Sequence, residues 1–124
     1  MIHLDADYLM LATVAGSPEA RRVRSWLSSG EPLATSAIAW MEFVTGPVSP
    51  DVVVAMNGVI EGRIEAVGQV EAELAAQLYN ELGRRRPMRY DYLIAACALS
   101  HDAALATANT KAFATFAARG LRVA

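Results

Sequence analysis

The chain opens with Met1-Ile2-His3-Leu4-Asp5-Ala6-Asp7 and passes, without Gly or Pro, into Tyr8-Leu9-Met10-Leu11-Ala12. A short apolar run that ends in an acid and leads into a helical pattern predicts a strand followed at once by a helix, with Asp5 at their junction. In open α/β sheets ligands bind at the carboxyl ends of the strands, so Asp5 is a candidate site residue. Capping of the helix is an equally good explanation of this acid.

The rest of the sequence alternates between strand and helix patterns. Short apolar or alternating segments predict strands, and segments that begin with Ser or Pro and end near Gly predict helices. The expected strands span residues 32–35, 63–67, 103–108 and 121–123, and the expected helices span 18–28, 37–44, 52–60, 70–83, 90–101 and 111–118. This alternation predicts an α/β fold, a short parallel sheet with helices on both faces.

Two apolar patterns identify expected core residues. Val70, Leu74, Leu78 and Leu82 recur at four-residue spacing along one face of the long helix. Cys97 is the only cysteine and lies in an apolar run, which favours a core residue over a nucleophile and excludes an internal disulfide.

Length and composition limit the class of protein. At 124 residues the chain fits a single domain, 1–124, that buries a core without disulfides or a structural metal. Apolar residues make up 54% of the chain, yet no uninterrupted span is long enough to cross a bilayer. No basic segment precedes the first apolar run, so we expect neither a signal peptide nor a membrane anchor, and a cytoplasmic protein.

The basic residues are almost all arginines. The net charge of −2 is not that of a protein that coats nucleic acid by charge alone. The arginines cluster as Arg21-Arg22-x-Arg24 and Arg84-Arg85-Arg86-x-x-Arg89. Because arginine binds phosphate bidentately, the two clusters could hold a polyanion beside an acidic site, although such clusters are also common at solvated helix ends.

Two further acids stand out by their surroundings. Glu42 is the only charge on an otherwise apolar helical segment, so it either faces a wet cleft or binds a cation. Asp91 falls in the first turn of a predicted helix, where the helix dipole favours an acid even without another role.

Four segments together resemble one family. They are the apolar run ending in Asp5-x-Asp7, then Ser36-x5-Glu42-Phe43-x-x-Gly46-Pro47, then Asp91-x-Leu93-Ile94-Ala95-Ala96-x-Ala98-Leu99, and Leu105-Ala106-Thr107-Ala108-Asn109-x3-Phe113. The chain resembles, over almost its whole length, a PIN domain of the kind found as the toxin of VapBC toxin–antitoxin pairs. The resemblance implies a metal-dependent endoribonuclease, a VapB-like antitoxin as partner, and a homodimer.

The resemblance also implies the site. Asp5, Glu42 and Asp91 are the expected catalytic acids and ligands of Mg²⁺ or Mn²⁺, which take oxygen ligands and keep several waters. Asp7, expected as a helix cap or an outer residue of the site, is grouped with Thr107 and Asn109 as supporting or fourth-position residues. Arg84, Arg85, Arg86 and Arg89 are the expected contacts to RNA phosphates.

One position departs from the family pattern. Relatives read Asn-x-x-Asp-Phe after the Ala-Thr strand, whereas this chain has Ala112 in place of the acid. Asn109 is retained, and capping of the last helix explains it as well as a role at a metal-bound water. The loss of this acid raises the alternative of a degenerate PIN domain that binds RNA or a partner protein without cutting.

Two other hypotheses concern the reaction and the assembly. Asp5-x-Asp7 after a first strand also looks like the nucleophile motif of haloacid dehalogenase-type phosphatases, but Leu9 stands where a hydroxyl residue is expected and Lys111 is the only lysine. The apolar excess of so small a domain favours an interface, with Trp40, Met41 or Tyr79 expected to be exposed as its anchors.

Overall fold

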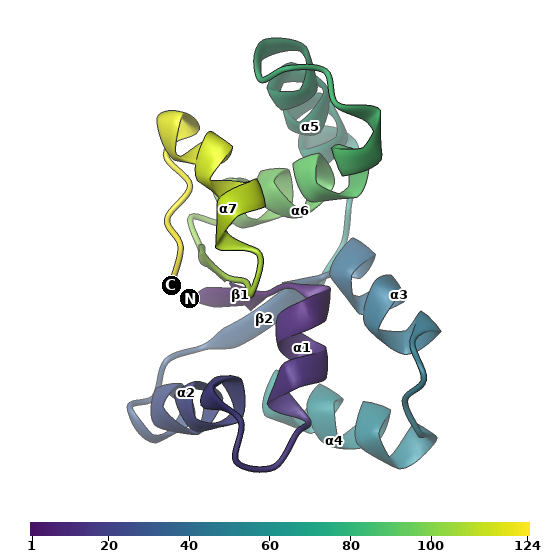
Figure 1. The fold of residues 1–124 in the computed structure, drawn as a ribbon, viewed down its shortest axis with the longest axis vertical. Coiled ribbons are helices and arrows are strands. Elements are labelled where there is room, and N and C mark those ends of the chain that lie inside the picture. Colours follow the sequence, from purple (N-terminus) through teal and green to yellow (C-terminus); the bar gives the residue numbers. More distant parts are fainter.

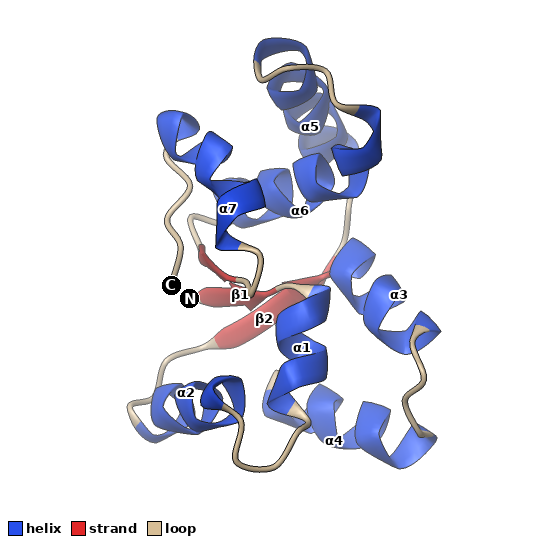
Figure 2. Cartoon of the chain, viewed as in Figure 1, coloured by secondary structure: helices blue, strands red, loops and turns tan.

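A parallel sheet of four short strands lies at the centre of the molecule (Figure 2), in the computed structural model of residues 1–124. The strand order is β3-β2-β1-β4, and every pair is parallel. The strands are β1 (Ile2–Leu4), β2 (Leu33–Ser36), β3 (Ile64–Glu65) and β4 (Ala104–Ala106). The predicted α/β fold with a parallel sheet is confirmed.

Helices cover both faces of the sheet, as predicted. Figure 1 shows α5, α6 and α7 on one side, α1, α2 and α4 on the other, and α3 next to α1 at the end of the sheet. The α-helices are α1 (Ala6–Ala12), α2 (Pro18–Ser28), α3 (Ala37–Thr45), α4 (Pro50–Val59), α5 (Gln69–Glu81), α6 (Arg89–Ser100) and α7 (Thr110–Phe113). Two 3₁₀-helices, η1 (Arg86–Met88) and η2 (Ala114–Arg119), complete the chain. None of the helices combines the length and apolar character needed to span a membrane.

Serine caps fix three of the helix starts that the sequence predicted. The hydroxyl oxygens of Ser17, Ser36 and Ser49 accept hydrogen bonds from the backbone N–H three residues later, at 2.9, 3.1 and 3.3 Å. Each bond satisfies one of the N–H groups that the first turn of a helix leaves without a partner.

Two apolar clusters pack against the two faces of the sheet. One is centred on α6, and the other joins the strands to α1, α2 and α4. Cys97 is fully buried on α6, which confirms it as a core residue, and burial raises the pKa of its thiol to about 12.

The strand ends and helix boundaries differ from the prediction in places. The strand expected at 63–67 is only two residues long, and the one expected at 121–123 is a single bridge between Val123 and Leu105. Both lie at the edges of the sheet, where a strand has a neighbour on one side only. The helix expected at 111–118 is divided into α7 and η2.

The expected burial of Val70 was wrong, and the expected exposure of interface anchors holds for one of three alternatives. Val70 is 66% exposed, whereas Leu78 is buried. A four-residue repeat drifts by about 40° per step around a helix, so Val70 has rotated off the face that Leu78 and Ala75 bury. Of the three residues offered as alternative interface anchors, Met41 is exposed, at 44%, as that expectation allows, whereas Trp40 and Tyr79 pack partly against the two cores.

The buried polar residue His3 lies in the middle of β1. Its ring is 1% exposed, and its centroid is 5.4 Å from that of His101, the C-cap residue of α6. His101 is held by two acceptors, with Nε2 at 3.1 Å from the Glu65 carboxylate and Nδ1 at 2.8 Å from the Cys97 carbonyl oxygen. We refer to His3 and His101 as the histidine pair.

Candidate functional site

A small cavity of about 40 Å³ gathers the acids that the sequence singled out. The end of β1 and the start of α1 supply Asp5 and Asp7, the middle of α3 supplies Glu42, and the first turn of α6 supplies Asp91. The lining is Asp5, Ala6, Asp7, Glu42, Asp91, Ile94, Asn109 and Phe113. We call this the acidic cavity.

Asp5 is both a helix cap and a residue of the acidic cavity. One carboxylate oxygen, Oδ1, accepts the Tyr8 N–H at 3.0 Å, which caps α1, and Oδ2 accepts the hydroxyl of Thr107. The side chain is 5% exposed. Burial, helped by the charges of Asp7 and Asp91, raises the pKa of Asp5 to about 6, although its two hydrogen bonds favour the ionised form.

The side chains of Glu42 and Asp91 are less buried, and neither carboxylate accepts a hydrogen bond of the kind that Asp5 accepts from Tyr8 and Thr107. Burial is the main cause that raises the pKa of Glu42, and the charges of Asp91, Asp5 and Asp7 raise it further. Burial and the charge of Asp7 raise the pKa of Asp91. The acids of the cavity are therefore close enough to oppose one another's ionisation.

Asp7, Thr107 and Asn109 have different parts around these acids. Asp5 and not Asp7 caps α1, so the expectation of Asp7 as a cap was wrong, and Asp7 instead lines the cavity. The Thr107 hydroxyl donates to Asp5 and accepts the Asn109 N–H at 3.0 Å, so Thr107 orients Asp5. The Asn109 side chain accepts the Ala112 N–H at 3.3 Å, which caps α7, and also lines the cavity.

Ala112 lies just outside the acidic cavity. It is half-buried in the first turn of α7 and lines a neighbouring cavity of about 170 Å³ that also contains Arg85 and Lys111. Phe113, the next residue, turns toward the acids.

The four acids have the right chemistry to bind a hard divalent cation, but their side chains are not positioned to bind one together. All four supply carboxylate oxygens, the ligands that Mg²⁺ and Mn²⁺ prefer. No group of three or more His, Cys, Asp or Glu side chains in the chain is placed so that it could hold a metal ion. None of the five ion pairs of the protein includes Asp5, Glu42 or Asp91, so no internal cation draws these carboxylates together.

The two arginine clusters lie in different places. Arg21 and Arg22 are on α2, on the face of the sheet opposite α6, where they bond to the carbonyl oxygens of Gly16 and Ala124 (Figure 1). This cluster therefore stabilises the fold locally. The second cluster occupies the turn from α5 to α6, and Arg89 is the first residue of the helix that carries Asp91.

Sequence reasoning missed several residues of the acidic cavity, namely Ala6, Ile94 and Phe113. A signal was present for two of them. Ile94 follows Asp91 by three residues and Phe113 follows Asn109 by four, and such spacings share one face of a helix.

Comparison with known proteins gives a family and a fold. The family model described as PIN domain matches residues 2–118. A comparison with curated proteins gives no significant match.

Solved structures of similar fold cover nearly the whole chain. A structure of FitAB bound to an IR36 DNA fragment has 24% identity and a TM-score of 0.70, covering 100% of this chain and 94% of that one. VapBC-1 from nontypeable Haemophilus influenzae has 22% identity and a TM-score of 0.70, covering 100% and 97%. A toxin–antitoxin complex from Klebsiella pneumoniae has 26% identity and a TM-score of 0.66, covering 92% and 91%.

Proposed function

The chain belongs to the PIN domain family, and we propose that it is a metal-dependent endoribonuclease, the toxin of a toxin–antitoxin pair. The observation that carries the proposal is the acidic cavity, where four carboxylates from three segments of the chain meet without a positive partner. Membership of the family also argues against the haloacid dehalogenase-type phosphatase, whose catalytic lysine has no counterpart here.

Asp5, Glu42 and Asp91 are the residues that would hold Mg²⁺ or Mn²⁺, with Asp7 at the rim. When bound there, the ion supplies a Lewis acid that makes water easier to deprotonate and stabilises negative charge on a phosphate. The donor set supports this choice, because it contains only oxygens and because four neighbouring carboxylates favour a multivalent cation.

Other residues of the protein would orient the metal ligands and contact the RNA. Thr107 fixes the rotamer of Asp5, which leaves Glu42 and Asp91 as the adjustable carboxylates. The raised pKa of Asp5 belongs to the cavity without an ion, and a bound divalent cation would lower that pKa and keep Asp5 ionised. Arg84, Arg85, Arg86 and Arg89 are the proposed contacts to RNA phosphates, since they lie on the turn that leads into the helix of Asp91.

A second candidate function is a degenerate PIN domain that binds RNA or protein without cutting. Ala112 favours it, because the acid expected beside the cavity is absent. Isothermal titration with Mn²⁺ separates the two candidates, since only the enzyme needs a divalent ion in the acidic cavity.

We also propose an antitoxin partner and a homodimer. The FitAB and VapBC-1 structures and the toxin–antitoxin complex from Klebsiella pneumoniae, all of similar fold, support an antitoxin partner. An arginine of such a partner would neutralise the acidic cavity and exclude a metal ion. Light scattering at micromolar concentration tests the dimer, and a monomer mass would remove that claim.

The cleavage reaction has a direct test. Purified protein is incubated with a structured RNA in Mn²⁺, in Mg²⁺, and in EDTA. We expect discrete cuts with either ion and none with EDTA, restored when the ion is returned in excess. Equal cutting in EDTA would show that a contaminating nuclease or a metal-independent reaction is responsible, and no cutting under any condition would favour the degenerate domain.

A further inference from the structure

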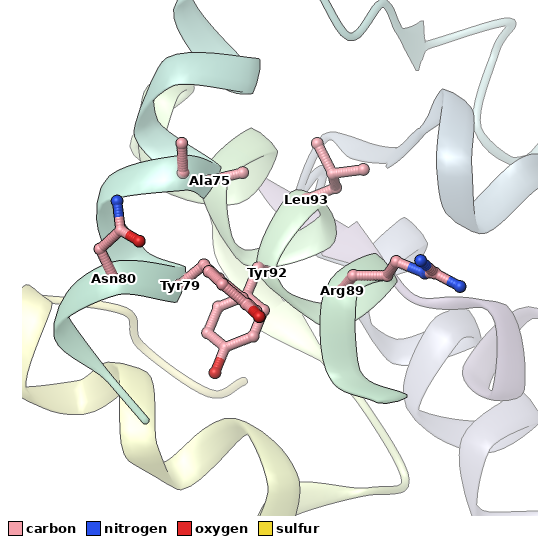
Figure 3. A pocket seen from close by; sticks show the side chains of 7 residues that line it. Ala75, Tyr79, Asn80, Arg89, Tyr92 and Leu93 are labelled. Atoms are coloured by element: carbon pink, nitrogen blue, oxygen red, sulfur yellow. The ribbon is translucent and has the colours of Figure 1, made fainter. Parts of the chain in front are cut away.

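A second cavity, of about 240 Å³, lies between α5 and α6, and no step of the proposed cleavage needs it (Figure 3). Its floor is made by the small side chains Ala75 and Ala76 of α5 and by Leu93 of α6. Its wall is made by Tyr79 and Tyr92. Cavities that hold drug-sized ligands are larger, roughly 300–1,000 Å³, so this one suits a single ring system. We call it the α5–α6 cavity.

The two tyrosines give this cavity a fixed aromatic wall. Their rings pack edge to face, with centroids 5.4 Å apart and planes at 79°. The Tyr92 hydroxyl donates to the Leu82 carbonyl oxygen at 3.0 Å and accepts the Arg85 N–H at 3.4 Å, so its ring cannot turn freely. Tyr92 is only 1% exposed and supports Tyr79 edge-on, so the partly exposed ring of Tyr79 is the surface on which a nucleobase can stack, beside Arg84 at 5.1 Å from its centroid.

Polar groups stand on opposite sides of the α5–α6 cavity. Figure 3 shows Asn80 on α5 and Arg89 on α6, with the cavity between the two helices. The Asn80 carbonyl oxygen accepts a hydrogen bond from Arg84, which leaves the amide NH₂ free to donate. A free amide beside a stacking surface can pair with the edge of a base.

Positive charge surrounds the opening. None of the arginines at positions 84, 85, 86 and 89 forms an ion pair with a carboxylate. Arg89 is the first residue of α6, where the helix dipole disfavours a cation and attracts an anion. An unpaired arginine at that position adds to the attraction for a phosphate. Aromatic rings next to unpaired arginines match single-stranded nucleic acid.

The first two turns of α6 contribute side chains to both cavities. Asp91 and Ile94 line the acidic cavity, whereas Arg89, Tyr92 and Leu93 line the α5–α6 cavity. An RNA strand that crosses this part of the helix therefore meets both cavities.

We propose that the α5–α6 cavity binds one base of the RNA strand beside the cleavage position, while Arg89 contacts the phosphate between that base and the acidic cavity. This inference rests on the proposed nuclease function and deepens it, because it assigns a site that reads an unpaired base. The substrate would then have to be single-stranded at that nucleotide.

A cavity-filling substitution tests the proposal with a matched control. Ala76→Trp places an indole in the α5–α6 cavity, whereas Ala72→Trp places the same group one turn earlier on α5, at an exposed position that does not line it. Both are made in a Glu42→Gln background to stop cleavage, and circular dichroism checks that each folds. Fluorescence anisotropy then measures binding of a short single-stranded RNA that the wild-type protein cuts at a mapped bond.

We expect Ala76→Trp to weaken binding about 10-fold, since one stacked base contributes roughly 1–3 kcal/mol, and Ala72→Trp to leave it within about twofold. The same RNA is made with an abasic nucleotide at each position in turn. An abasic nucleotide at one position near the cut bond should weaken binding to the Glu42→Gln protein about 10-fold. The same abasic RNA should bind the Ala76→Trp protein no more weakly than the intact RNA does.

The outcomes separate this inference from the function on which it rests. If the wild-type protein cuts RNA but Ala76→Trp binds like Ala72→Trp and no abasic position matters, the base site is wrong and the nuclease stands. If the wild-type protein neither binds nor cuts RNA, the nuclease itself is wrong. If Ala76→Trp alone lowers the mass seen by light scattering, the cavity is an interface between two copies, and the base site is overturned.

Discussion

The acidic cavity and the histidine pair both place titratable side chains inside the fold, but only the histidine pair balances its charge internally. His101 has a carboxylate and a carbonyl oxygen as partners, and burial lowers the pKa of His3 to about 4, so His3 stays neutral at physiological pH. The charged groups of the acidic cavity are all carboxylates, and after burial the charges of neighbouring acids raise the pKa values of Asp5, Glu42 and Asp91 further. Within the histidine pair only His101 has partners inside the fold, whereas both ring nitrogens of His3 are buried without a hydrogen-bond partner. The like charges gathered in the acidic cavity require a partner from outside.

The largest expected effect is a loss of RNA cleavage when the acidic cavity, but not the histidine pair, is changed. Asp5→Asn, Glu42→Gln and Asp91→Asn should each lower metal-dependent RNA cleavage by at least about 100-fold. Substituting residues that merely support metal ligands already lowers metal affinity or activity by about 10–100-fold. The proteins should remain folded, since these changes preserve shape. Glu65→Gln, which alters the carboxylate of the histidine pair, is the control and should cut at the wild-type rate. Single-turnover assays on a labelled RNA measure both.

The second effect concerns stability without metal. The pKa of Asp5 is raised from 3.8 to about 6 in the folded state, so the folded protein binds more protons than the unfolded chain between these values. Stability therefore falls as the pH rises from about 4 to 6 and stays lower above that. Asp5→Asn should raise the free energy of unfolding at pH 7 in EDTA by about 1–3 kcal/mol. Urea unfolding measures it, and a less stable variant would contradict the repulsion described for the cavity.

The histidine pair should show the opposite pH dependence. The pKa of His3 is lowered from 6.5 to about 4, mainly by burial, so the unfolded chain binds the extra proton between these values. Stability contributed by neutral His3 is lost as the pH falls through that window. His3→Leu should therefore reduce the stability difference between pH 8 and pH 5 by about 2 kcal/mol. Urea unfolding in EDTA at both pH values checks this, and an unchanged difference would mean that His3 is charged in the fold.

A smaller effect tests how Asp5 is held. Thr107→Val removes the hydroxyl that donates to Asp5, which should raise the pKa of Asp5 further and weaken Mn²⁺ binding about 10-fold. The loss should be greatest near pH 6 and diminish at pH 8, where Asp5 ionises regardless. Thr107→Ser keeps the hydroxyl and should restore binding. Titration calorimetry at the two pH values measures the difference.

The smallest expected effect is a gain. Ala112→Asp adds an acid in the first turn of α7, where the helix dipole stabilises it by about 0.3–1 kcal/mol. We expect tighter Mn²⁺ binding and faster cleavage, because the new carboxylate would stand beside the acidic cavity. Ala117→Asp, at an exposed position of η2, is the control. No change in either measurement would favour a domain that has lost catalysis.

The sequence predicted the acids of the acidic cavity better than it predicted the strand lengths and the packing around them. Local patterns made Asp5, Glu42 and Asp91 candidates but left capping or the helix dipole as explanations of Asp5 and Asp91, and only the resemblance to PIN domains grouped the three into one site. Local patterns do not contain the pairing of edge strands, which left the strands near residues 64 and 123 too long. The α5–α6 cavity could not be predicted, because Ala76, Tyr79 and Leu93 meet only when two helices pack.

The dual attachment of Asp5 has a consequence for amide hydrogen exchange. Its N–H donates to the Ala106 carbonyl oxygen at 3.0 Å, its carboxylate is bonded to Thr107, and Thr107 in turn holds the Asn109 N–H. These bonds join β1, which has a neighbour on both sides, to the end of β4. The amide of Asp5 should then exchange only when the sheet opens, whereas the amide of the exposed Asn109 needs only a local opening of its loop. The chemistry would thus be anchored in the slowest-exchanging part of the protein, and a destabilised variant would keep its active geometry until it unfolds globally.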